Sequence, residues 1–274
     1  MATGVSRIGE VFRRARDEDR AAFMPYYVVG YPTLETSVQV LKALAQAGAD
    51  MLEIGVPFSD PLADGPTNQA AAQRALEQGV SLADVFQAVY RLRREGIGIP
   101  FNLMGYYNPF LAYGLDEVCR DAVSAGVDGL IIPDLPPDER DGQEMVARCR
   151  QHGLAFIPLL APTSTLERIR VARDAASGFI YLVSVTGITG ARDHLPPDLE
   201  VFVGRVRDTV DVPVAVGFGI STPEQARQVA QIADGVIVGS ALVRLGNGDQ
   251  PVERIRELAS TLAQAMRRQS SPTG

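Results

Sequence analysis

Short apolar runs alternate along the chain with segments in which apolar residues recur at helical spacing. The apolar runs are bounded by Gly and Pro, which is typical of strands covered by helices. Eight strands are predicted in this way, at residues 24–30, 49–55, 99–104, 128–133, 154–160, 178–184, 212–217 and 234–239. The predicted helices lie between them, at 34–47, 66–76, 81–95, 115–124, 138–152, 165–176, 198–209 and 222–232, with a terminal helix at 251–268. Because parallel strands need such crossovers, the pattern predicts an α/β fold.

A degenerate repeat supports this interpretation. The segments AQAGADMLEIG, VSAGVDGLIIP, DAASGFIYLVS and AQIADGVIVG each end a helix, turn at a small residue and enter a strand. With eight such units, closure into a single (β/α)8 TIM barrel is favoured over an open doubly wound sheet. We expect one domain over residues 1–268 and a disordered tail at 269–274.

The N-terminal segment has its own pattern. Apolar residues recur at helical spacing among Arg and Glu between residues 5 and 16, which predicts an amphipathic helix that packs on the barrel. The apolar positions are Val5, Ile8, Val11, Phe12 and Ala15.

Composition and charge narrow the class of protein. The 274 residues, 46% of them hydrophobic, suffice for the full core of one barrel, and the net charge of -7 argues against a surface for duplex nucleic acid. No apolar run approaches the ~20 residues needed to span a bilayer and no secretory signal is seen, so we expect a cytoplasmic protein. Cys119 and Cys149 lack metal-ligand spacing and are expected to be reduced thiols.

The most informative segment is LEIGVPFSDPLADGPT, residues 52–67. Successive side chains of a strand point to opposite faces, so if Leu52 and Ile54 face the helices, Glu53 points into the barrel. A carboxyl group there either finds hydrogen-bond partners or has a raised pKa, and a raised pKa suits a general acid near neutral pH. The alternative is a structural carboxylate satisfied by its neighbours.

The loop after this strand carries Asp60 and Asp64 and is longer than common loops between a strand and a helix. Loops at the carboxyl ends of the strands form the active sites of such barrels. Asp60 precedes a Pro and is predicted to initiate a turn. For Asp64 two interpretations stay open: a cap of the following helix, or a residue of the active site.

Three glycine-bearing segments follow the last three strands: TGITG (186–190), GFGIS (217–221) and GSAL (239–242). Barrels often bind phosphate with these loops and with the N-terminus of a short extra helix, where backbone N–H groups meet the anion. We therefore expect a short helix before the C-terminal one, with Ser240 as its N-cap. Other chemistries are disfavoured, because the third glycine of a dinucleotide fingerprint and the GxSxG motif are both absent, and His152 and His194 lie in polar segments.

The chain resembles the tryptophan synthase α subunit family along essentially its whole length. The resemblance is carried, in order, by LEIGVPFSDPLADGPTNQ, NLMGYYNP, IIPDLP, YLVSVTGITGAR, GFGIS and GSALV. It implies a lyase that splits indole-3-glycerol phosphate into indole and glyceraldehyde-3-phosphate. Two departures, Met104 in place of another aliphatic residue and GITG in place of GVTG, preserve side-chain volume approximately.

The resemblance also implies the roles of individual residues. Glu53 is the general acid/base, and Asp64 binds the ring nitrogen of the indole. The remaining positions of the implied substrate site are Tyr181 beside the glutamate, Tyr26, Met104, Tyr106 and Phe218 around the indole, Thr189 on a lid over residues 185–195, and Gly190, Gly219, Gly239 and Ser240 around the phosphate. Asp134, after the fourth strand, either supports the site or caps a turn.

By the same resemblance the reaction needs no metal and no organic cofactor. The expected partner is a pyridoxal-phosphate-containing β subunit, in an α2β2 heterotetramer that takes the indole onward. Two competing interpretations are another phosphate-binding barrel, such as an indole-glycerol-phosphate synthase or a sugar-phosphate isomerase, and a non-catalytic subunit that binds a phosphate ligand and only activates its β partner. Intact Glu53 and Asp64 count against both.

Overall fold

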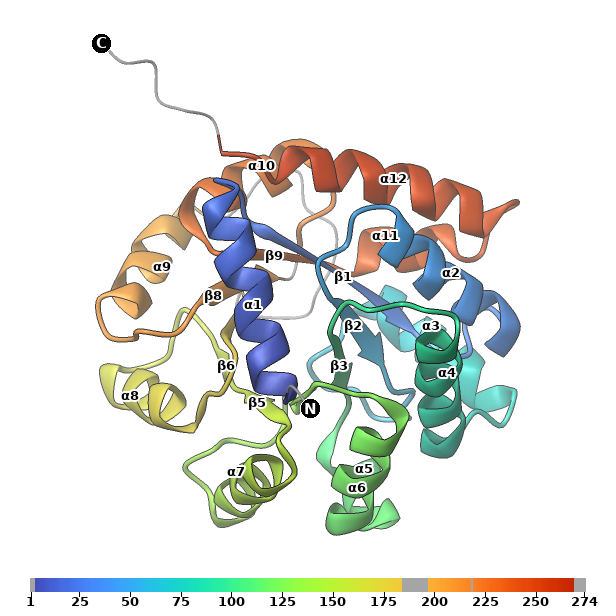
Figure 1. The fold of residues 1–274 in the computed structure, drawn as a ribbon, viewed down its shortest axis with the longest axis horizontal. Helices are drawn as coiled ribbons and strands as arrows, with labels where there is room; N and C mark the ends of the chain where they lie inside the picture. The colour runs from blue at the N-terminus through green and yellow to red at the C-terminus, as the bar shows by residue number, and fades with distance from the viewer. Residues whose placement is uncertain (1–2, 184–196, 218, 269–274) are drawn as a thin grey trace.

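The computed structural model describes residues 3–183, 197–217 and 219–268. Within these residues all the strand segments run parallel in one sheet of order β5-β4-β3-β2-β1-β9-β8-β7-β6. The segments are β1 (Ala22–Val28), β2 (Leu52–Gly55), β3 (Phe101–Met104), β4 (Gly129–Ile131), β5 (Ala155–Ile157), β6 (Leu159–Leu160), β7 (Ile180–Val183), β8 (Val214–Gly217) and β9 (Gly235–Val238). The sheet wraps into a barrel surrounded by helices (Figure 1), so the fold expected from the sequence is confirmed.

Segments β5 and β6 are the two halves of one predicted strand, 154–160. Pro158 separates them; it has no N–H to give to a neighbouring strand, although its carbonyl accepts a hydrogen bond from the N–H of Tyr181 at 3.0 Å. β5 pairs with β4, and β6 pairs with β7. The split strand therefore joins the two ends of the sheet, and the structure corresponds to eight barrel strands.

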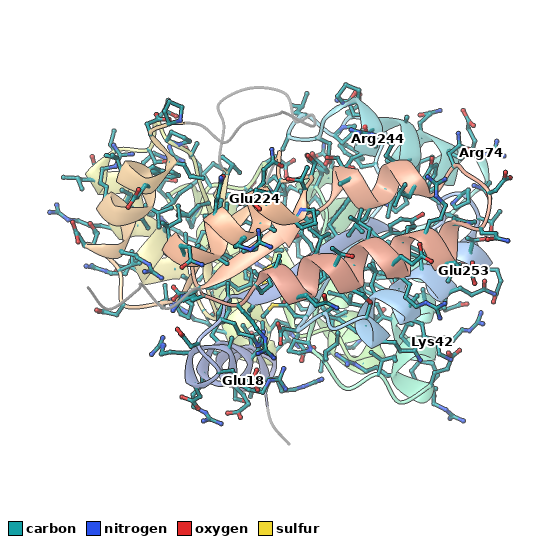
Figure 2. The ribbon with its side chains drawn as sticks, turned by 90° about the horizontal axis from the view of Figure 1, so that it is seen from above. Glu18, Lys42, Arg74, Glu224, Arg244 and Glu253 are labelled. Atoms are coloured by element: carbon teal, nitrogen blue, oxygen red, sulfur yellow. The ribbon has the colours of Figure 1, made fainter. Side chains whose placement is uncertain are left out.

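The helices cover the outside of the barrel (Figure 1). Those predicted between strands are found within two residues of their expected bounds: α2 (Leu34–Gln46), α3 (Pro66–Glu77), α4 (Leu82–Arg94), α6 (Leu115–Ala125), α7 (Arg140–His152), α8 (Leu166–Ala175), α9 (Leu199–Arg207) and α10 (Pro223–Ile232). The terminal helix, α12 (Pro251–Ala265), ends three residues earlier than predicted. Figure 2 shows charged side chains such as Glu253 of α12 and Arg74 of α3 at the periphery.

The amphipathic N-terminal helix, α1 (Gly4–Asp17), lies across one end of the barrel (Figure 1). The ring of Phe12 packs against that of Phe179, just before β7, with the ring centroids 5.5 Å apart. Arg7 forms an ion pair with Asp128, just before β4, and Arg14 forms one with Asp50, just before β2. Helix α1 therefore closes the end at which the strands begin, which leaves the opposite end for a site.

Two short helices complete the fold. The sequence pattern did not predict α5 (Tyr107–Tyr113). This helix contains Pro109 in its first turn, where proline is tolerated. The expected extra helix is present as α11 (Ser240–Leu245), but Ser240 is its first residue rather than its N-cap. The N-cap is Gly239, and no side chain caps the helix, so the prediction for Ser240 was wrong by one position. In the part of the chain described, no helix is both long enough and apolar enough to cross a membrane.

Candidate active site

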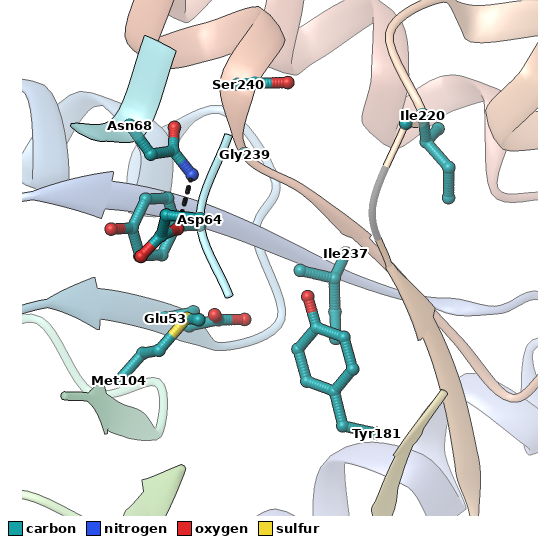
Figure 3. Close-up of a pocket in the computed structure, with 11 residues that line it drawn as sticks. Glu53, Asp64, Asn68, Met104, Tyr181, Ile220, Ile237, Gly239 and Ser240 are labelled. Carbon is teal, nitrogen blue, oxygen red and sulfur yellow. Dashed lines mark hydrogen bonds between the residues drawn. The ribbon is translucent and has the colours of Figure 1, made fainter. Parts of the chain in front are cut away.

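A cavity opens at the carboxyl ends of the strands, at the end of the barrel opposite α1. Figure 3 shows residues that line it. Its walls come from β1, β2, β3, β7 and β9 and from the segments that follow β2, β8 and β9. The residues that line it are Tyr26, Glu53, Asp64, Asn68, Met104, Tyr181, Gly219, Ile220, Ile237, Gly239 and Ser240. The fold thus brings together residues that lie more than 200 positions apart in the chain.

Glu53 is the buried carboxyl group at the base of this cavity. In the sheet it is the register partner of Tyr26 on β1 and of Asn102 on β3, so it points into the barrel as strand alternation predicted. Only 3% of it is exposed. Burial, and secondarily the nearby charge of Asp64, raises the pKa of Glu53 from 4.5 to about 8. Among the described residues, none donates a hydrogen bond to this carboxyl group, so the interpretation as a satisfied structural carboxylate is not supported.

Asp64 faces the same cavity from the loop after β2, and it is held by two donors. The side-chain nitrogen of Asn68 donates to its Oδ1 at 3.1 Å, and the hydroxyl of Tyr106 donates to its Oδ2 at 2.8 Å. Burial raises the pKa of Asp64, and the two hydrogen bonds oppose that rise because they stabilise the ionised form. The N-cap of α3 is Gly65, which has no side chain, so the alternative role of Asp64 as a helix cap is excluded.

Asp60, by contrast, is exposed, and its carbonyl accepts a hydrogen bond from the N–H of Leu62 at 2.9 Å. This is the turn that the sequence predicted. Asp60 does not line the cavity.

Tyr26 and Tyr181 bring buried hydroxyl groups to the two carboxyl groups. Burial and the charges of Glu53 and Asp64 hold the pKa of both tyrosines well above 10, so both hydroxyls keep their protons at neutral pH. Two glycines make room for them: a Cβ at Gly55 would overlap the hydroxyl of Tyr26, and a Cβ at Gly217 would overlap that of Tyr181. Glycine at these strand ends is therefore a requirement of the site.

Tyr106 does not itself line the cavity; it lies behind Asp64. Its hydroxyl accepts a hydrogen bond from the N–H of Ala63 at 3.1 Å, and its ring stacks on Phe58 with the centroids 5.4 Å apart. Asp134 supports this arrangement, because its carboxylate accepts from the N–H of Tyr107 at the start of α5 at 2.9 Å. Tyr106 thus ties the loop after β2 to the carboxylate that the loop presents.

The glycine segments after β8 and β9 also line the cavity. Gly219 follows β8 with φ of 79°, a left-handed conformation that favours glycine, and Gly239 and Ser240 begin α11. The first N–H groups of a helix have no partner within it, so those of α11 are available to an anion. Three predicted site residues, Thr189, Gly190 and Phe218, lie outside the described residues.

The sequence reading missed three lining residues, Asn68, Ile220 and Ile237. Ile237 could have been found from strand alternation in β9, and Ile220 from its place next to Gly219. Asn68 lies in the quoted motif but has no spacing signal of its own. The described part of the chain contains no cluster of three or more His, Cys, Asp or Glu side chains placed to hold a metal ion.

Two carboxyl groups that share one cavity but differ in their hydrogen-bond donors are suited to acid–base catalysis. Together, the fold and the cavity are those of a (β/α)8-barrel enzyme with a site suited to proton transfer on a small substrate. Comparison with known proteins then gives the family.

The chain belongs to the tryptophan synthase alpha chain family, whose model matches residues 12–270. The tryptophan synthase alpha chain of Dehalococcoides mccartyi is 47% identical over 262 residues, which cover 96% of this chain and 100% of that protein. That of Roseiflexus castenholzii is 49% identical over 255 residues, covering 93% and 97% of the two chains.

Solved structures agree. A structure from Aquifex aeolicus and one of Mycobacterium tuberculosis tryptophan synthase each superpose with a TM-score of 0.89 at 42% identity, over 98% of this chain and 100% of theirs. The family expected from the sequence is confirmed, and with it the class of enzyme, a carbon–carbon lyase of tryptophan biosynthesis. The interpretation as a different phosphate-binding barrel is not supported.

Proposed function

We propose that this chain cleaves indole-3-glycerol phosphate into indole and glyceraldehyde-3-phosphate, with Glu53 as the proton-transfer group and Asp64 as the electrostatic partner of the ring nitrogen. The observation that carries the proposal is the contrast between the two carboxyl groups. The pKa of Glu53 is raised to about 8, whereas Asp64 accepts two hydrogen bonds that favour its ionised form. In this proposal Glu53 is therefore the member of the pair that carries the transferable proton.

The reaction begins with proton transfer to the ring. The Glu53 carboxyl group donates its proton to C3 of the indole, and the positive charge that develops on the ring is shared with N1. The ionised Asp64 stabilises this charge at N1–H. Tyr106 and Asn68 hold the carboxylate in place, so little reorganisation is needed as the charge appears.

Bond cleavage follows. The Glu53 carboxylate removes the proton from the hydroxyl on the glycerol carbon attached to C3. The electrons of that O–H bond form the aldehyde, and those of the carbon–carbon bond return to the ring. Indole and glyceraldehyde-3-phosphate result, and Glu53 regains its proton. Every proton is thus moved by one side chain of this chain, and the steps use no organic cofactor and no metal.

Substrate binding is assigned to the remaining walls. Tyr26, Met104 and Ile237 line the cavity together with Glu53 and Asp64 and offer apolar surface to the indole. The phosphate is placed at Gly219, Gly239 and Ser240, where backbone N–H groups and the start of α11 favour an anion. Gly190, Thr189 and Phe218 keep the roles implied by the family resemblance, as predictions.

The family name implies a β subunit as partner. We propose an α2β2 heterotetramer in which the β subunit carries pyridoxal phosphate and consumes the indole. The cytoplasmic location expected from the sequence also stays a prediction.

An assay of the purified chain with indole-3-glycerol phosphate, with and without a β subunit, tests the proposal. Indole release, alone or increased by the β subunit, is the expected result. If the chain increases β-subunit turnover but releases no indole under either condition, the competing interpretation as a non-catalytic activator is correct and the proposal is wrong.

A further inference from the structure

Asn68 is a cavity residue to which no role has been given beyond its contact with Asp64. It lies in the first turn of α3, and only 9% of it is exposed. Its side-chain nitrogen donates to Asp64 Oδ1 at 3.1 Å. Its side-chain oxygen is buried, and no donor among the described residues reaches it. Figure 3 shows the amide nitrogen directed toward Asp64 and the oxygen directed away from it.

The orientation of this amide is fixed by charge. If the amide were turned over, its oxygen would face the Asp64 carboxylate, and two acceptors would oppose each other. The nitrogen must therefore face Asp64, and the oxygen points away from that carboxylate. A buried carbonyl oxygen without a donor is destabilising and uncommon in folded proteins. The cavity thus holds an acceptor already in place for a donor that a ligand would bring.

The chemistry of the substrate identifies that donor, on the basis of the proposed function. Indole-3-glycerol phosphate brings three donors. The ring N1–H goes to Asp64, because a carboxylate is a stronger acceptor than a neutral amide. The hydroxyl on the carbon attached to the ring loses its proton to Glu53. The donor that remains is the hydroxyl on C2 of the glycerol chain, midway between the ring and the phosphate.

We infer that Asn68 determines specificity for the glycerol chain: its side-chain oxygen accepts a hydrogen bond from the C2 hydroxyl of the substrate, while its nitrogen positions Asp64. The nitrogen of this amide thereby contacts the carboxylate that binds the ring, and its oxygen contacts the glycerol part of the substrate, which leaves. Asn68 lines the same cavity as Asp64, Gly239 and Ser240, the residues assigned to the ring and to the phosphate, which fits a contact to the middle of the substrate.

The test combines a side-chain change with a substrate change. The kcat/KM of the wild-type chain and of Asn68→Leu is measured with indole-3-glycerol phosphate and with the analogue that lacks the C2 hydroxyl. Wild type should prefer the full substrate by about tenfold, the value of one hydrogen bond whose loss leaves a buried acceptor unpaired. Asn68→Leu should show a preference of less than about twofold, because the acceptor is gone.

Matched variants keep the test decisive. Gln69 is the next residue and is exposed, and its side-chain nitrogen donates to the backbone carbonyl of Asp64 at 2.8 Å, so Gln69→Leu should keep the tenfold preference. Asn68→Ala removes the same acceptor with less demand on packing and should lose the preference as Asn68→Leu does. If the role of Asn68 were purely structural, its variants would lower kcat/KM equally for the full substrate and for the analogue.

The results also separate this inference from the proposed function. If wild type releases no indole from the full substrate, with or without a β subunit, the proposed function fails. If wild type is active but has no preference for the C2 hydroxyl, or if Asn68→Leu keeps that preference, the inference about Asn68 is wrong and the proposed function stands.

Discussion

Buried carboxyl groups lie at both ends of the barrel, and the two ends differ in the donors that surround them. Where the strands begin, Asp128 accepts from Arg93 at 2.7 Å, from Arg7 at 2.9 Å and from the N–H of Phe101 at 2.8 Å. Where the strands end, no donor among the described residues reaches Glu53. A carboxylate surrounded by donors stabilises the fold, whereas one without them is available to a substrate proton.

The beginning of the strands repeats one arrangement. Asp50 accepts from the N–H of Phe23 at 2.9 Å, and Asp234 accepts from the N–H of Val214 at 3.0 Å, as Asp128 does from Phe101. In each case the aspartate precedes one strand and binds the first residues of the neighbouring strand. The recurring sequence pattern of helix, small residue and strand therefore also encodes a clamp between adjacent strands.

Burial alone does not distinguish the two ends. It raises the pKa of Asp128 as well as that of Glu53, although two arginines and a backbone N–H act against it at Asp128. What separates them is the availability of donors. The comparison therefore predicts that changes at the carboxyl groups where the strands end remove activity. Changes at the carboxyl groups where the strands begin should remove stability.

The largest expected effect is on turnover. Glu53→Gln keeps the shape of the side chain but cannot donate and recover a proton, so indole release should fall about a thousandfold, the usual contribution of general acid–base catalysis. Steady-state indole release measures this, and thermal unfolding at pH 7 serves as the control for folding. Turnover within about tenfold of wild type would contradict the role of Glu53.

The next effect is on stability. Asp128→Asn removes the charge that pairs with Arg7 and Arg93, and we expect a loss of about 3–5 kcal/mol in the free energy of unfolding. Because Asp128 is far from the cavity, kcat/KM of the folded variant should stay within about twofold of wild type. Urea unfolding and the indole assay measure the two quantities. Retained stability with lost turnover would reverse the comparison.

Glu53 should also lower stability at alkaline pH. The unfolded chain ionises this group near pH 4.5 and the folded chain near pH 8, so between these values only the folded state binds the proton. The free energy of unfolding therefore falls as pH rises through this window. Glu53→Gln lacks this penalty, and at pH 9 it should be more stable than wild type by about 2–4 kcal/mol. The gain should disappear at pH 4, and a gain that is equal at both pH values would contradict the linkage.

The smallest effect concerns how Asp64 is held. Tyr106→Phe keeps the stacking on Phe58 but removes the hydrogen bonds to Asp64 and Ala63, and kcat/KM should fall about tenfold. Tyr107→Phe is the matched control, because its hydroxyl has Asp141 as its acidic neighbour and Asp141 lies outside the cavity. Burial and Asp141 raise the pKa of that hydroxyl. This control variant should leave kcat/KM unchanged. Equal losses in the two variants would show that the effect is not specific to Asp64.

Local pattern predicted much of this molecule, and contacts between distant segments account for what it missed. Strand alternation was enough to predict that Glu53 points into the barrel. Helix α5 was missed because it is short and its start is fixed by Asp134, which comes from a different loop. The split at Pro158 follows from pairing with two different neighbours. The role of Tyr106 behind Asp64 likewise depends on how two loops meet.

The central claim is that Glu53 begins the reaction protonated, and the pH dependence of kcat/KM tests it most directly. Between pH 6.5 and 9.5, kcat/KM should be level at first and then fall about tenfold per pH unit above an apparent pKa near 8, as the proton donor is lost. The substrate phosphate titrates near pH 6 and does not produce this fall. A profile that stays level up to pH 9.5 would show that turnover does not require a proton with an apparent pKa near 8, and it would contradict the account.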